Sequence, residues 1–157
     1  IKAFKILKSH GVKKDIKLVI LGEGPERQNI IDLIKALNLM DEVFLLGHKS
    51  NPFPLIKNAS IFVLSSDNEG FGLVLVEALA LKKQIVSTDC PSGPKEILKD
   101  GKFGKLVPVN NAAKLSEGLL AMLNGEIFFE ERSLFKRAQS FSVENCFREF
   151  SKLLNEA

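Results

Sequence analysis

Short apolar runs alternate with amphipathic helical patterns along the whole chain, and this alternation limits the fold more than any other property of the sequence. Residues 16–21 read IKLVIL and are followed by Gly22, and residues 61–65 read IFVLS. Nearly continuous apolar runs of this length are typical of parallel strands buried on both faces. Strands that alternate with helices through short connections predict an α/β fold, a doubly wound parallel sheet with helices on both faces.

Apolar periodicity and turn residues give the expected positions of the elements. The predicted strands span residues 16–21, 42–47, 61–65, 84–88 and 102–109. The predicted helices span residues 1–10, 26–39, 51–59, 72–82, 93–101 and 111–124, and further helix is expected in the C-terminal stretch. Because no repeat or linker interrupts this order, residues 1–157 are predicted to form a single domain. The first residues begin inside a helical pattern with neither an initiator methionine nor an N-cap, so we expect a fragment of a longer, two-domain chain.

The composition argues against several classes of function. The formal net charge is only +3 and acidic and basic residues are interleaved, so no nucleic-acid partner is expected. Cys90 and Cys146 form no CxxC pair and no ligand cluster with His10 or His48, which predicts a reduced, cytoplasmic protein without structural zinc. No apolar run approaches the roughly 18 residues of a membrane span. A further expectation is peripheral contact with the inner face of a membrane through a set of lysines: Lys2, Lys5, Lys8, Lys13 and Lys14. The plainer alternative is that these lysines form a solvated helix face.

A single carboxylate interrupts the apolar helix predicted at residues 72–82. Every residue from 71 to 81 is apolar or glycine except Glu77, and an unpaired ionised group in an apolar interior costs several kcal/mol. Glu69 precedes it, and the backbone N–H groups of residues 70–73 at the helix N-terminus lie between the two. This row of carboxylate, anion site and carboxylate matches the hexose, diphosphate and ribose of a sugar nucleotide. The alternative is that Glu77 pairs with a buried cation or caps a neighbouring backbone.

Two glycine-containing loops follow predicted strands, where ligands of such sheets bind. GEGP spans residues 22–25 and NEGFG spans residues 68–72. Glycine lets a backbone approach a ligand closely, although glycine at a strand end is also common for turn geometry alone. A dinucleotide-binding G-x-G-x-x-G is excluded because Arg27 stands where its third glycine belongs, and the Walker lysine is absent as well.

The run EGFGLVLVE at residues 69–77 resembles the motif of two glutamates separated by seven residues in the retaining glycosyltransferases of family 4, also called glycosyl transferases group 1. Further blocks that resemble this family span residues 18–26, 43–80, 85–98 and 101–119, so the likeness covers nearly the whole chain. The resemblance implies a Rossmann-like fold that forms the C-terminal, donor-binding half of a GT-B enzyme.

The resemblance also implies roles for individual residues. Glu69 is expected to be the catalytic residue that hydrogen-bonds the donor hexose, and Glu77 to hold the ribose hydroxyls. Backbone donors to the hexose and diphosphate are expected from Gly70, Phe71, Gly72 and Leu73. Close approach of the first loop to the donor is expected at Gly22 and Gly24. The border of the nucleobase is expected at Gly47, His48 and Lys49.

The implied activity is retaining transfer of a hexose or N-acetylhexosamine from a nucleotide sugar, with UDP as the expected nucleotide. No metal or cofactor is expected, since the sequence has no Asp-x-Asp motif. The acceptor is expected to be a glycan or a lipid-linked molecule held by the N-terminal domain, so this fragment alone is expected to be inactive. Two alternatives stay open from the sequence: a sugar-nucleotide 2-epimerase of GT-B architecture, and a non-catalytic nucleotide-binding module.

Overall fold

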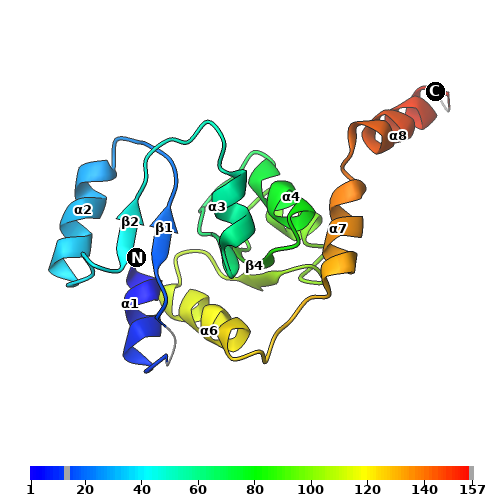
Figure 1. The fold of residues 1–157 in the computed structure, drawn as a ribbon. Coiled ribbons are helices and arrows are strands. Elements are labelled where there is room, and N and C mark those ends of the chain that lie inside the picture. Colours follow the sequence, from blue (N-terminus) through cyan, green and yellow to red (C-terminus); the bar gives the residue numbers. More distant parts are fainter. Residues whose placement is uncertain (13–14, 156–157) are drawn as a thin grey trace.

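The computed structural model describes residues 1–12 and 15–155, and its elements follow the predicted order of strands and helices (Figure 1). Lys13 and Lys14 lie outside the described residues. The strands are β1 (Leu18–Ile20), β2 (Val43–Leu45), β3 (Ile61–Leu64), β4 (Gln84–Thr88) and β5 (Lys105–Val107). The helices are α1 (Lys2–Ser9), α2 (Arg27–Ala36), α3 (Phe53–Asn58), α4 (Leu73–Ala80), α5 (Pro94–Ile97), α6 (Ala112–Leu123), α7 (Glu131–Gln139) and α8 (Val143–Asn155).

The strands are all parallel, but they form two sheets rather than the single sheet that the sequence predicts. β1 pairs with β2, and β4 lies between β3 and β5. No backbone ladder joins β1 to β3 among the described residues. Helix packing joins the two sheets instead, because α1 lies against α6 and one hydrophobic core receives side chains from both sheets. The predicted α/β class with helices on both faces is confirmed.

The central strand β4 is buried on both of its faces. Ile85 and Val86 point to opposite faces, and both are fully buried. Val86 belongs to the core beneath α1, α2 and α6, which also contains Phe4 and Leu119. Ile85 belongs to the second core beneath α4, α5 and α7. The carboxyl end of β4 is therefore held from both sides.

Helix α8 has an apolar stripe that no other element of the described chain covers. Val143 is 81% exposed and Phe147 is 70% exposed, although the spacing of the stripe is that of a packed helix face. In Figure 1 the helix extends away from the rest of the fold. No helix among the described residues is long and apolar enough to cross a membrane.

Candidate functional site

The loops that follow β1 and β2 lie side by side. The backbone N–H of Gly22 donates to the carbonyl of Gly47 at 2.9 Å, so the structure brings these two predicted residues together. Gly22 has a φ of 121°, and a Cβ atom there would meet open space, as it would at Gly24. His48 and Lys49 follow on an exposed stretch. The first loop therefore leaves room for a ligand at Gly22 and Gly24, whereas a Cβ atom at Gly47 would lie 2.7 Å from Oε1 of Glu23.

The loops that follow β3 and β4 form a second pair, in much tighter contact. Thr88, the last residue of β4, donates its hydroxyl to the carbonyl of Ser66 at 2.6 Å. Gly93 approaches Phe71 so closely that a Cβ atom on Gly93 would lie 1.7 Å from the Phe71 carbonyl oxygen. The loop that carries the predicted residues 69–73 is thus held by the loop after β4.

Glu69 lies in this loop with its side chain half-buried. Its Oε1 atom accepts a hydrogen bond of 2.6 Å from the hydroxyl of Ser66, three residues earlier. No other hydrogen bond and no ion pair of this carboxylate occurs in the described part of the chain. The second oxygen, Oε2, is therefore available to a ligand.

The N-terminus of α4 follows directly and has no side-chain cap. Its N-cap residue is Gly72, which adopts the left-handed conformation with a φ of 87°. Leu73 in the first turn is 65% exposed. Uncapped N–H groups and the helix dipole together favour an anion at such a position.

Glu77 lies on the second turn of α4, half-buried, on the side of the helix that is not packed against the core. Leu75, Ala78 and Leu79 form the packed side, and each is fully buried. In the residues that the structure describes, the Glu77 carboxylate makes neither a hydrogen bond nor an ion pair. Glu77 therefore neither pairs with a buried cation nor caps a backbone group of the described residues. Its charge is tolerated because one face of this apolar helix is open.

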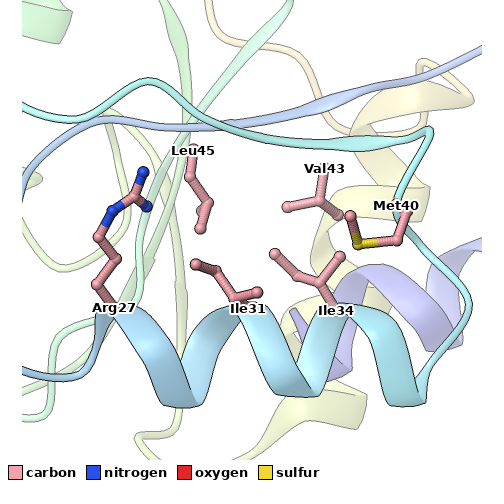
Figure 2. A pocket seen from close by; sticks show the side chains of 6 residues that line it. All are labelled: Arg27, Ile31, Ile34, Met40, Val43 and Leu45. Atoms are coloured by element: carbon pink, nitrogen blue, oxygen red, sulfur yellow. The ribbon is translucent and has the colours of Figure 1, made fainter.

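Two hollows of the structure lie away from these loops. Figure 2 shows the first, of about 240 Å³, between α2 and β2, with apolar walls and Arg27 at one end. The Arg27 guanidinium pairs with Glu23 at 3.6 Å. The second hollow, of about 480 Å³, lies between β5 and α6. Neither hollow is lined by the predicted donor-binding residues.

Among the described residues, no group of three or more histidine, cysteine, aspartate or glutamate side chains is placed to bind a metal ion. Cys90 is buried and Cys146 is exposed, and both are free thiols.

Three residues of this region were not singled out from the sequence: Ser66, Thr88 and Gly93. A local signal for the hydrogen bond of Ser66 exists in the sequence, because Glu69 follows it by three positions. The contacts of Thr88 and Gly93 join segments that are distant in the sequence, so no local pattern reports them.

With this geometry in view, comparison with known proteins identifies the family. Residues 1–140 match the family model described as glycosyl transferases group 1. The chain belongs to this family. The resemblance noted from the 69–77 motif is thereby confirmed, while the roles of the individual site residues stay predictions.

Among curated relatives, the chain is 43% identical over 115 residues to a Campylobacter jejuni protein, N-acetylgalactosamine-N,N'-diacetylbacillosaminyl-diphospho-undecaprenol 4-alpha-N-acetylgalactosaminyltransferase. The match covers 73% of this chain and 32% of that protein. The chain thus spans about a third of the length of this relative.

Solved structures share the fold. The lipopolysaccharide outer core galactosyltransferase WaaB superposes with a TM-score of 0.81 at 23% identity, over 89% of this chain and 40% of that one. A mutant of S. aureus TarM in complex with fondaparinux, alpha-GlcNAc-glycerol and UDP superposes with a TM-score of 0.75 at 26% identity, over 98% of this chain and 32% of that one. These neighbours are GT-B glycosyltransferases, which confirms the Rossmann-like C-terminal half of that fold.

Proposed function

We propose that this chain is the donor-binding domain of a glycosyltransferase that moves a hexose or N-acetylhexosamine from a UDP sugar to a glycan or lipid-linked acceptor, with retention of configuration. The name of the C. jejuni relative, which is an N-acetylgalactosaminyltransferase for a diphospho-undecaprenol-linked acceptor, supports this class of sugar and acceptor. The UDP bound to TarM supports the nucleotide. Such an acceptor suits a cytoplasmic protein that works at the inner face of a membrane.

One arrangement carries the proposal: two carboxylates without charged partners flank an uncapped helix N-terminus. Glu69 presents a free oxygen before the helix, and Glu77 presents its carboxylate on the open side of the second turn. The first turn of α4, which begins at Leu73, lies between them. Carboxylates accept paired hydrogen bonds from vicinal hydroxyls, and helix N-termini hold phosphate. The donor hexose, diphosphate and ribose would occupy these three positions in that order.

The same groups account for the chemistry. The bond between the anomeric carbon and the diphosphate oxygen breaks, and the negative charge that develops on the diphosphate is stabilised by the N–H groups at the start of α4. Glu69 holds the hexose hydroxyls while the ring changes shape. An acceptor hydroxyl attacks on the face that the diphosphate leaves, and a departing phosphate oxygen takes its proton.

The proposal is tested on the full-length protein with UDP-, GDP- and ADP-linked sugars. Calorimetric titration identifies the nucleotide, and incubation with a lipid-linked or oligosaccharide acceptor identifies the product. We expect binding of a UDP sugar and an α-linked product from the α-linked donor. Inversion at the anomeric carbon would contradict the retaining mechanism. A 2-epimerised sugar in the absence of acceptor would indicate an epimerase, and binding without any product would indicate a nucleotide-binding module.

A further inference from the structure

We propose that Ser66 and Thr88 are positioning residues that orient the Glu69 carboxylate toward the donor hexose. This inference rests on the proposed function above and extends it by two residues to which neither the family match nor the sequence motif assigns a role. It starts from two short hydrogen bonds that connect a central strand of the sheet to the site.

The first bond fixes one oxygen of the carboxylate. The hydroxyl of Ser66 donates to Oε1 of Glu69 at 2.6 Å, within the normal range for a hydroxyl and an ionised carboxylate. Oε2 accepts no hydrogen bond from the described residues. A carboxylate held by one oxygen keeps a defined orientation and directs its other oxygen at a ligand. Without the hydroxyl, the side chain of Glu69 would be free to take other rotamers.

The second bond fixes the residue that holds Glu69. The Thr88 hydroxyl donates to the backbone carbonyl of Ser66 at 2.6 Å, and its oxygen lies 3.4 Å from the carbonyl oxygen of Leu64. Thr88 is only 4% exposed and pairs with Val107 in the β4–β5 ladder. Because β4 is buried on both faces, this end of the strand is a rigid support for the start of the loop. Two hydrogen bonds in series, from Thr88 to Ser66 and from Ser66 to Glu69, thus connect the sheet to the site. We call this pair of bonds the relay.

This relay matters for the hexose and not for the nucleotide. The ribose and diphosphate are proposed to contact Glu77 and the start of α4, and neither Ser66 nor Thr88 bonds to those residues. Precise placement of a group against the reacting sugar lowers the barrier to transfer, so a small displacement of Glu69 costs turnover. Loss of the relay should therefore reduce turnover, and it should reduce the difference in affinity between the UDP sugar and UDP. The affinity for bare UDP should stay unchanged.

The test compares Ser66→Ala with Ser66→Thr, which keeps a hydroxyl, in the full-length protein. Ser65→Ala is the matched control, because Ser65 is the adjacent exposed serine and its hydroxyl makes no hydrogen bond among the described residues. Thr88→Val and Thr88→Ser form a second pair that removes or keeps the donor to the loop. Each variant is measured for the dissociation constants of UDP and of the UDP sugar, for kcat, and for melting temperature.

We expect Ser66→Ala to lower kcat about tenfold and to lose most of the affinity difference between the UDP sugar and UDP. The affinity for UDP itself should stay within about twofold, and Ser66→Thr should restore kcat. Thr88→Val should act in the same direction, and Thr88→Ser and Ser65→Ala should resemble the wild type.

Two results would overturn the inference. One is a Ser66→Ala protein with an unchanged kcat and an unchanged ratio of the dissociation constants for UDP and the UDP sugar. The other is a parallel loss of UDP and UDP-sugar affinity with a lower melting temperature, which indicates a purely structural role. If instead the wild type binds no nucleotide sugar, or Glu69→Gln leaves kcat unchanged, the proposed function fails first and the inference fails with it.

Discussion

Replacing Gly93 by alanine places a methyl group where the structure has no room for it. The new Cβ atom would lie 1.7 Å from the carbonyl oxygen of Phe71 and 2.5 Å from its carbonyl carbon, whereas real Cβ contacts are essentially never shorter than 3.0 Å. The obstructing atoms belong to the backbone, so one of the two loops must move by over 1 Å. Phe71 resists this movement because its ring packs edge-to-face against Phe141, with centroids 5.8 Å apart.

The expected destabilisation has two parts. Gly93 has a φ of 91° and a ψ of −68°, a combination that residues with a side chain rarely adopt and that costs them about 1–3 kcal/mol. Insertion of a group into a well-packed interior costs about 1–3 kcal/mol more. Together these give a loss of roughly 2–6 kcal/mol in the free energy of unfolding, a large share of the stability of a typical domain.

The control for this prediction is Gly101→Ala. Gly101 has nearly the same φ, 89°, but its Cβ atom would meet only an ordinary contact of 3.6 Å with the Gly104 carbonyl oxygen. It should lose only the backbone part, about 1–2 kcal/mol. Chemical denaturation of the full-length variants gives both values, and titration with the UDP sugar reports the displaced 69–73 loop through weaker binding. A Gly93→Ala protein no less stable than Gly101→Ala would refute the argument that the two loops are in this close contact.

Two further predictions concern the contact of α7 with α5 and the start of α7. Arg137 donates from Nε to the Ile97 carbonyl at 2.9 Å and from Nη2 to the Glu96 carbonyl at 2.7 Å. Because lysine lacks this fork, Arg137→Lys should cost about 1–3 kcal/mol in urea denaturation, and an unchanged midpoint would contradict that. Hydrogen bonding from the Ser133 side chain lowers the pKa of Glu130 below its usual 4.5. The Glu130 carboxylate therefore stabilises the fold above pH 4.5, and this stabilisation is lost as the pH falls through the pKa of the folded state. The difference in melting temperature between wild type and Glu130→Gln should therefore be full at pH 7 and vanish at low pH, and a difference that persists there would count against this account.

The sequence predicts the elements well because their signals are local. The apolar runs at residues 16–21 and 61–65 predict strands, and β1 and β3 form there. The predicted burial on both faces is wrong for β1, because Val19 is 45% exposed. The apolar pattern of residues 72–82 predicts a helix, and α4 spans Leu73–Ala80 with the left-handed Gly72 as its N-cap. Each of these properties depends on residues only a few positions apart.

Other features depend on contacts between distant segments, and the sequence does not contain a local signal for them. The apolar run around Glu77 does not show which face of the helix is open. In the structure α4 packs through one face only, so the charge reaches the open side. The separation of β1–β2 from β3–β4–β5 is a matter of backbone pairing between strands, which hydrophobic patterning does not report. The bond from Thr88 to Ser66 likewise requires the folded sheet to bring the two loops together.

Titration of UDP into full-length Glu77→Gln protein tests the central claim most directly, with Glu69→Gln as its matched counterpart. If Glu77 binds the ribose, its replacement should weaken UDP binding by roughly 1–3 kcal/mol, because a charge-assisted hydrogen bond becomes a neutral one. Glu69→Gln should leave UDP binding unchanged and reduce turnover instead. Unchanged UDP affinity in Glu77→Gln, accompanied by a lower melting temperature, would contradict the account and make Glu77 a structural residue.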